Sequence, residues 1–226
     1  MGFRALKKDI RCLLVADDFQ TALAAFDHMA ERQAVNPLLS FFYDTDTVVR
    51  WHAITAFGRV LDNLARKDIE SARVVMRRLM WNLNDESGGI GWGSPEAMGE
   101  TMALHAGLAD QYSHILVSYI NPNGNFLEHE VLQRGLLWGL GRLAQVRPER
   151  LQTAVPFLHP FLQSHDPIHR GLAAWVIGAL QDASARHLLK PLTDDNMDIL
   201  FYFDLRVQSR TVAKFAEDAL FALIDT

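Results

Sequence analysis

Apolar residues recur along most of the chain at spacings of three and four positions, the period expected of helices that bury one face. The run over residues 48–64 shows this pattern well. Its apolar face comprises Val49, Ala53, Ala56, Phe57, Val60, Leu61 and Leu64. Similar runs occupy residues 130–144, 167–180 and 210–224. The pattern predicts an all-α protein.

The helical runs also resemble one another. Val49-Arg50-x-x-Ala53-x-x-Ala56-x-Gly58 is matched by His169-Arg170-x-x-Ala173-x-x-Val176-x-Gly178. Small residues at this spacing allow neighbouring helices to approach closely. Copies that recur every roughly 35 to 45 residues are typical of a helical solenoid.

Two motifs carry a family resemblance: Asp46-x-x-Val49-Arg50-x-x-Ala53-x-x-Ala56-x-Gly58 and Asp166-Pro-x-x-Arg170-x-x-Ala173-x-x-x-x-Gly178. Through them the chain resembles the HEAT-repeat family, in its bacterial phycobilisome-lyase-like (PBS-lyase HEAT-like) form. The resemblance covers about four-fifths of the chain and implies an α-α superhelix of about five repeats, each an outer helix, a turn and an inner helix.

The implied outer and inner helices can be assigned to residue ranges within one domain, residues 1–226. They are 37–43/47–64, 68–84/95–109, 111–120/128–145, 151–164/167–181 and 184–192/209–224, after capping helices in residues 1–34. Two segments interrupt the pattern. One is a Gly-rich insertion at 84–95, and the other, 198–209, predicts a short β-hairpin that turns near Asp204.

Composition narrows the function classes. Hydrophobic residues make up 49% and charged residues 22% of the 226 positions, and the formal net charge is -5. This charge lacks the basic excess of most nucleic-acid-binding surfaces, so no nucleic-acid partner is expected. No apolar stretch is long enough for a membrane span, and Cys12 is the only cysteine, so we expect a cytoplasmic protein.

The candidate binding residues lie mostly in or beside the turns within the repeats, and in a solenoid these turns lie along one rim. These turns are expected near Asp44 and Asp46 and at 84–94, 121–129, 164–169 and 204–206, with Asp46, Ser94 and Asp166 as helix caps. Within them, the Gly-rich segment surrounds one tryptophan with carboxylates. The predicted ligand or partner site is Asp85, Glu86, Trp92, Glu96, Glu100 and His129. The alternative is a structural turn whose Trp92 lies in the core.

Other chemical motifs have structural interpretations. Glu128-His129-Glu130 contains a single His-Glu dipeptide, too few ligands for a two-metal site, so neither a metal nor a cofactor is expected. Trp51, Trp138 and Trp175 are expected in the core. Arg50, Arg170 and Arg210 begin successive inner helices and are expected to form a ladder of hydrogen bonds to neighbouring turns, such as Asp46 or Asp166.

Three functions remain open. The leading hypothesis is a non-catalytic scaffold or adaptor that binds a protein or peptide through its concave face and turn rim, because no complete catalytic constellation is visible. The alternative is a small-ligand- or metal-binding enzyme with its site around residues 84–100. A further alternative, a HEAT-like DNA glycosylase, rests on Trp81-x-x-x-Asp85.

Overall fold

A computed structural model describes residues 2–84 and 91–223 of the chain. In this part the chain forms twelve α-helices and one two-stranded antiparallel sheet. The helices are α1 (Phe3–Leu14), α2 (Phe19–Ala24), α3 (Glu31–Phe41), α4 (Thr47–Lys67), α5 (Ile69–Asn84), α6 (Ser94–Leu104), α7 (Ala106–Ser118), α8 (Glu130–Ala144), α9 (Val155–Leu162), α10 (Pro167–Leu180), α11 (Arg186–Leu189) and α12 (Val212–Ala222). The strands are β1 (Asp198–Phe203) and β2 (Arg206–Thr211).

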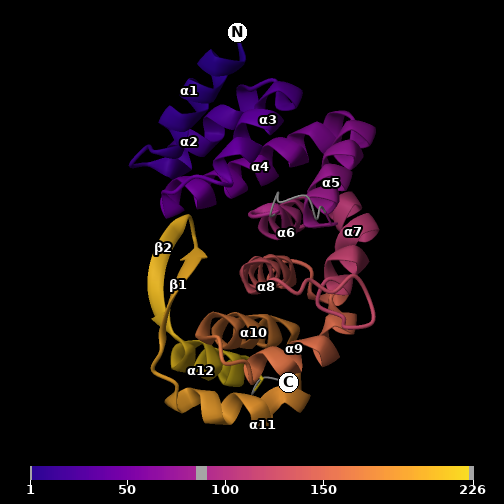
Figure 1. The fold of residues 1–226 in the computed structure, drawn as a ribbon, viewed down its shortest axis with the longest axis vertical. Coiled ribbons are helices and arrows are strands. Elements are labelled where there is room, and N and C mark those ends of the chain that lie inside the picture. Colours follow the sequence, from indigo (N-terminus) through magenta and orange to yellow (C-terminus); the bar gives the residue numbers. More distant parts are fainter. Residues whose placement is uncertain (1, 85–90, 224–226) are drawn as a thin grey trace.

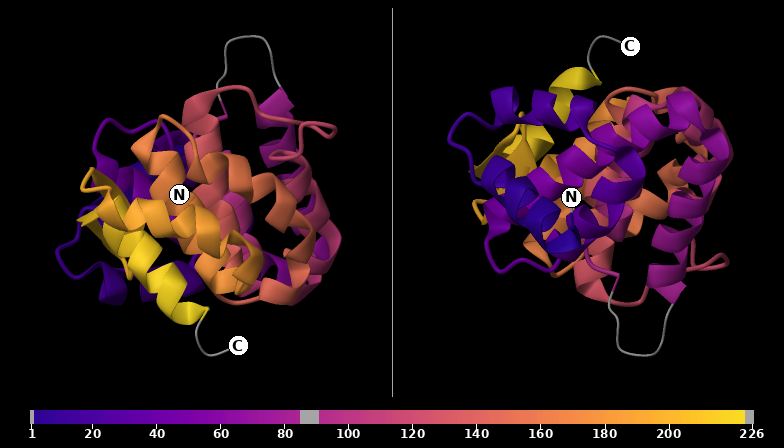
Figure 2. Two further views of the ribbon diagram at one scale, coloured as in Figure 1. Left: turned by 90° about the horizontal axis from the view of Figure 1, so that it is seen from below. Right: turned by 90° about the horizontal axis from the view of Figure 1, so that it is seen from above.

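The helices form two layers that are stacked along the long axis of the molecule, as the predicted solenoid requires (Figure 1). Helices α4, α6, α8, α10 and α12 make the inner layer, and each contacts the next along the stack (Figure 1). Helices α3, α5, α7, α9 and α11 make the outer layer. Figure 2 looks along the stack and shows the outer helices on one side and the hairpin on the other. The fold is therefore an α-α solenoid with one hairpin.

The helical pairs follow the predicted order, with several shifted boundaries. The first outer helix, α3, begins at Glu31 rather than at Pro37, which lies inside it. Helix α6 ends at Leu104, before the predicted 109, because the His105 side chain accepts the backbone N–H of Leu108 and caps α7. A side-chain cap supplies an acceptor that the helix start lacks, so a new helix begins there.

The apolar face predicted for residues 48–64 is the buried face of α4. Each of its seven members is at most 3% exposed: Val49, Ala53, Ala56, Phe57, Val60, Leu61 and Leu64. The buried residues of the successive repeats form one continuous core that runs along the stack. The helical period of the apolar residues thus predicted which side of α4 is buried.

Glycine sets the distance between the inner helices α6 and α8. A Cβ added at Gly99 would lie 2.3 Å from the Gly139 carbonyl oxygen, well inside van der Waals contact. The two backbones therefore touch at these positions. This confirms that the small residues in the repeat serve close helix packing.

Two of the three predicted helix caps are confirmed. The Asp46 carboxylate accepts the backbone N–H groups of Val48 and Val49, and Asp166 accepts that of Ile168. The prediction for Ser94 is wrong, because Gly93 is the N-cap of α6. Gly93 has a φ of 77°, which disfavours a side chain, and a Cβ there would meet the Phe42 ring at 2.7 Å.

The hairpin prediction is confirmed. Strands β1 and β2 pair from Asp198↔Thr211 to Phe203↔Arg206 and turn through Asp204 and Leu205, both at positive φ. The expectation that 204–206 would share the turn rim is wrong. The hairpin extends from α12 across the concave side to α4, where the Leu205 carbonyl lies 3.4 Å from His52 Nε2 (Figure 1). Because the two strands extend away from α12, the turn between them lies far from the turns of the other repeats.

Candidate functional site

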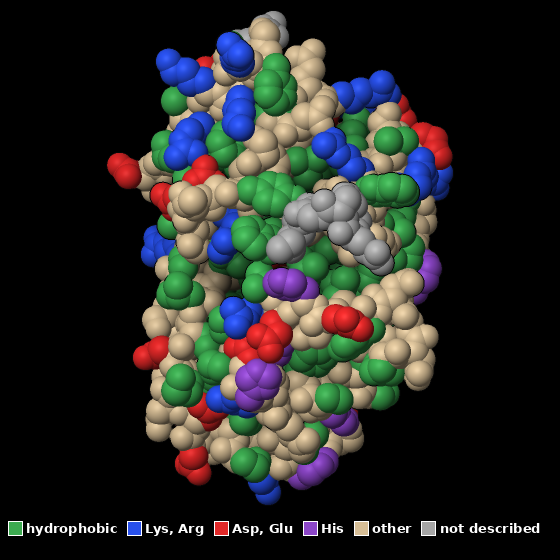
Figure 3. Space-filling view, viewed as in Figure 1, with side chains coloured by type: hydrophobic (Ala, Val, Ile, Leu, Met, Phe, Trp, Pro, Cys, Tyr) green, Lys and Arg blue, Asp and Glu red, His purple; other side chains and the backbone are tan. Residues whose placement is uncertain are grey.

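A pocket of about 420 Å³ opens between the inner helices and the hairpin. Helices α4, α6, α8 and α10 and strand β1 all contribute to its walls. The residues that line it include Arg50, Trp51, Trp92, Glu96, Trp138 and Tyr202. In Figure 3, hydrophobic side chains surround a hollow near the middle of the face shown. The volume lies within the range of about 300–1,000 Å³ that is usual for ligand pockets.

Aromatic side chains close the pocket on the hairpin side. The Tyr202 ring stacks on Trp51 with centroids 4.9 Å apart and an interplanar angle of 4°. Trp138 lies 4.6 Å from Trp51 and donates its indole N–H to the Tyr202 carbonyl over 2.8 Å. The Tyr202 hydroxyl lies 2.9 Å from Thr55 Oγ1, and burial raises the pKa of this phenol. These contacts fix the hairpin to α4 and α8 at once.

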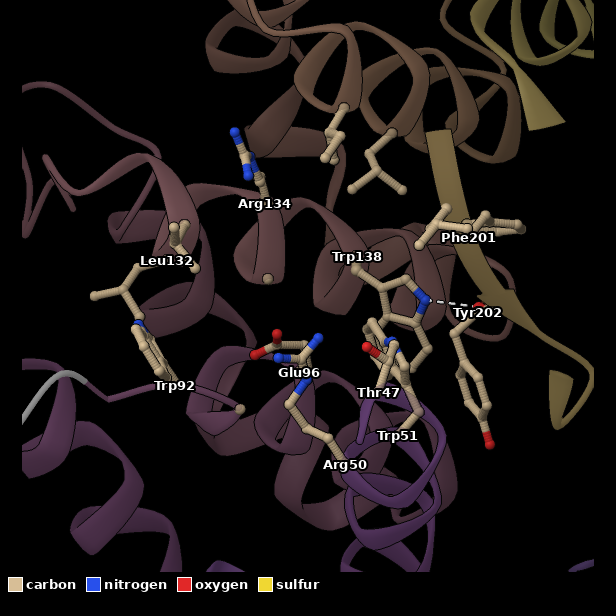
Figure 4. Close-up of a pocket in the computed structure, with 16 residues that line it drawn as sticks. Thr47, Arg50, Trp51, Trp92, Glu96, Leu132, Arg134, Trp138, Phe201 and Tyr202 are labelled. Carbon is tan, nitrogen blue, oxygen red and sulfur yellow. Dashed lines mark hydrogen bonds between the residues drawn. The ribbon is translucent and has the colours of Figure 1, made fainter. Parts of the chain in front are cut away.

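Trp92 stands at the opposite side of the pocket (Figure 4). It is 38% exposed and lies 6.4 Å, centroid to centroid, from Tyr43. The adjoining Gly93 packs on Phe42, which places the Trp92 backbone against the core while the indole faces the pocket. Trp92 thus lies at the boundary between pocket and solvent rather than in the core.

Glu96 supplies a carboxyl group to the pocket from the first turn of α6. Its Oε2 atom is buried and has no hydrogen-bond partner in the described part of the chain. Burial raises the pKa of Glu96 to about 7, and the nearby Arg50 charge opposes part of this increase. The carboxyl packs on Gly135, where an added Cβ would lie 2.5 Å from its Cδ atom.

Arg50 points into the same part of the pocket as Glu96 (Figure 4). No ion pair joins the two side chains, and Arg50 has no hydrogen bond to any residue that the structure describes. The predicted arginine ladder is therefore incomplete. Arg170 bonds Asp195 at 2.7 Å and the Ser164 carbonyl at 2.8 Å, whereas Arg50, at the same repeat position, has no such partner.

Arg134 is the other arginine of the pocket wall. It donates to Asp166 over 2.7 Å, and this bond together with the Ile168 N–H lowers the pKa of Asp166 although burial opposes the decrease. Asp166 also caps α10, so one carboxylate joins α8 to α10. Arg134 is thus held in place by the scaffold, which leaves Arg50 as the unpaired cation among the described lining residues.

The structure separates the other predicted site residues. Glu100 is 5% exposed and accepts Arg142 Nε over 2.7 Å, so it forms a buried ion pair beside a second cavity of about 300 Å³. His129 caps α8 by accepting the Val131 N–H and does not line the pocket. Asp85 and Glu86 lie outside the described residues. Of the six predicted residues, Trp92 and Glu96 share the pocket.

For several residues that line the pocket, the amino-acid sequence predicts structural roles. Trp51 and Trp138 were expected in the core; Trp138 is 4% exposed, while Trp51 is partly buried and both line the pocket. Trp175 is also partly buried and packs on Phe201. Arg50 was expected in the ladder. The residues around Arg50 in the sequence do not indicate that it lines a pocket. The hairpin that completes the pocket lies about 150 positions later in the chain.

The charged groups of the described pocket lining are the carboxyl group of Glu96 and the guanidinium groups of Arg50 and Arg134. A carboxyl group with a pKa near neutrality can exchange a proton, but no Ser, Cys, His or Lys is among the described lining residues. Across residues 2–84 and 91–223, no three His, Cys, Asp or Glu side chains form a group that would hold a metal ion. None of the described helices has the length and apolar content that crossing a lipid bilayer requires.

Comparisons with known proteins identify the repeat. Residues 131–180, from α8 to α10, match the family model of the HEAT-like repeat. The chain is similar to an uncharacterized protein of Archaeoglobus fulgidus, with 26% identity over 167 residues, which are 74% of this chain and 78% of the relative. Two crystal structures of engineered proteins share the fold. One has a TM-score of 0.55 at 17% identity and covers 100% of this chain and 98% of its own. The other has a TM-score of 0.51 at 16% identity, with coverages of 98% and 99%.

Proposed function

We propose, from the HEAT-like repeat that residues 131–180 match, that the chain is a non-catalytic binding module for a protein or peptide partner. Its site is the pocket between Trp92 and the hairpin. Stacked repeats give such proteins an extended surface on which partners bind. The observation that carries the proposal is a preformed apolar pocket in which the Arg50 side chain and the Oε2 atom of Glu96 have no hydrogen-bond partner among the described residues.

The hairpin limits how a partner engages the concave side. Tyr202 and its contacts with Trp51 and Trp138 occupy the space along which an extended peptide would pass between α4 and α8. A partner therefore inserts a side chain or a chain end into the pocket and contacts the turn rim with the rest of its surface. The exposed Trp92 suits such a contact, because tryptophan is enriched at the centres of interfaces.

Site-specific photo-crosslinking tests this proposal. A photoreactive amino acid at Val131, a 41% exposed pocket residue, is expected to crosslink a discrete partner in an extract of cells that carry the protein. The same label at Val74, 58% exposed on the outer helix α5, serves as the matched control. Crosslinks of equal yield and identity at both positions would exclude the pocket as the binding site.

A pair of tryptophan variants sharpens the test. Trp92→Ala is expected to lower the crosslink yield at position 131, because it removes one side of the pocket. Trp81→Ala removes an indole that is 72% exposed on α5 and is expected to leave the yield unchanged. Equal effects of the two substitutions would contradict the assignment of Trp92.

Small-ligand binding is the second candidate, and the pocket volume favours it. The DNA glycosylase alternative gains no support from the described residues. Trp81 lies on the outer layer rather than on the concave side, and Lys and Arg side chains in Figure 3 gather over the α1 end of the molecule.

A further inference from the structure

We propose that the pocket captures the C-terminal residue of a partner chain. Arg50 binds the terminal carboxylate, Glu96 accepts the backbone N–H of the same residue, and the apolar side chain packs against Trp51 and Trp138. This inference rests on the proposed binding function and specifies what enters the site.

Arg50 provides the first argument. Its guanidinium lies in a mostly apolar pocket without an ion-pair or hydrogen-bond partner among the described residues. The equivalent Arg170 is fully engaged by Asp195 and by backbone carbonyls. A cation in such surroundings favours an anionic guest, and the arginine fork matches a carboxylate with two parallel hydrogen bonds.

Glu96 provides the second argument. Its buried Oε2 lacks a donor, and an unmade hydrogen bond of a buried group is costly. The charged groups that face it are Arg50 of α4 and Arg134 of α8, and Arg134 already binds Asp166. A terminal residue carries a carboxylate and an N–H donor two bonds apart. It therefore satisfies Arg50 and Glu96 together, which an isolated carboxylate does not.

The closed side of the pocket provides the third argument. Tyr202, stacked on Trp51 and bonded through its carbonyl to Trp138, blocks a chain that would continue past α8. Only the end of a chain or one side chain fits such a pocket. The indole walls accept an apolar or aromatic side chain, and the preceding residues of the partner leave the pocket on the side of Trp92, whose side chain is 38% exposed.

Calorimetric titration of the full chain tests the inference with the tetrapeptides Gly-Ser-Gly-X, in which X is Leu, Ile, Met, Phe, Tyr or Trp. At least one peptide with a free carboxylate is expected to bind. The same peptide with a C-terminal amide is expected to bind at least about tenfold more weakly, because a charge-assisted hydrogen bond is lost. The Arg50→Gln variant is expected to lose this preference. Arg77→Gln, on the exposed surface of α5, is the matched control and keeps it.

Several outcomes would overturn the inference. They are equal affinity for acid and amide, a preference that survives Arg50→Gln in a variant with native helical circular dichroism, or no binding of any peptide in the set. Binding of free L-phenylalanine without binding of N-acetyl-L-phenylalanine would assign the pocket to free amino acids instead. Crosslinking at Val131 reads out partner binding separately, so it can succeed where the peptide titration fails.

Discussion

At the scale of single residues, Glu96 couples the pocket to pH. Its pKa in the folded chain is about 7, raised by burial from 4.5. Between these two values the folded chain holds a proton that the unfolded chain has lost. Stability therefore falls as pH rises through this window and levels off above about 7. The apolar walls of the folded pocket thus favour the protonated, neutral form of the Glu96 carboxyl group.

The Glu96→Gln variant tests this coupling. It keeps the shape of the side chain but has no charge, so it is expected to be more stable than the parent at pH 8 by up to about 3 kcal/mol. Near pH 4.5 the difference is expected to vanish. Denaturant midpoints at both pH values measure it, with Glu128→Gln, on the exposed 121–129 turn, as the control. A difference between variant and parent that does not change with pH would contradict the explanation.

At the scale of elements, the contact of α6 with α8 depends on Gly99. Because a Cβ there would overlap the Gly139 backbone, Gly99→Ala is expected to separate the two helices and to lower the free energy of unfolding by about 1–3 kcal/mol. Gly107→Ala in α7 is the control. Its nearest neighbour is the His105 side chain at 3.2 Å, so the gain in helix propensity offsets the contact. Chemical denaturation of both variants makes the comparison, and an equal loss in the two would refute the close-packing argument.

The hairpin is joined to α4 by a side-chain hydrogen bond between Tyr202 and Thr55. Tyr202→Phe and Thr55→Val are each expected to destabilise the chain by about 1 kcal/mol, because each leaves one buried hydroxyl unpaired. The double variant is expected to cost less than the sum of the two, since neither hydroxyl then remains. A double-mutant cycle from equilibrium unfolding gives the coupling energy, and strict additivity would show that the bond contributes nothing.

At the scale of the whole molecule, the hairpin links the two ends of the solenoid. Repeats otherwise contact only their neighbours, so a solenoid without such a link can unfold in parts. Here residues of β1 and β2 contact α4, α10 and α12 together. The hairpin is therefore expected to make the unfolding of the N- and C-terminal repeats one transition.

Replacing residues 198–211 with a short Gly-Ser linker tests this coupling. The strands begin and end side by side, at Asp198 and Thr211, so a short linker closes the gap. The variant is expected to unfold in more than one calorimetric step, with the calorimetric enthalpy exceeding the van't Hoff enthalpy. Gln208→Ser, an exposed change on β2, is expected to keep the behaviour of the parent. A single transition in the linker variant would show that the helical stack alone is cooperative.

The fold was largely predictable because its signals are local. Apolar spacing predicted the buried face of α4, and the recurrence of Arg50 and Arg170 in one motif predicted repeats. The ends of the helices were predicted less accurately. Ser94, for example, was expected to cap α6, but the N-cap is Gly93, whose position depends on its packing against Phe42. The candidate site was predictable only in part. Trp92 in the Gly-rich insertion and Glu96 just after it could be chosen from the sequence, whereas the pocket role of Arg50 could not.

The sequence by itself therefore determined the helices, their repeat order and the presence of a hairpin, since these follow from spacings of a few residues. Tertiary structure alone decided where that hairpin lies. It brings Tyr202 onto Trp51 and Trp138 and turns an open concave surface into a pocket. The physical reason is distance along the chain. A contact between residues about 150 positions apart leaves no periodic trace, whereas burial of a helix face recurs every turn.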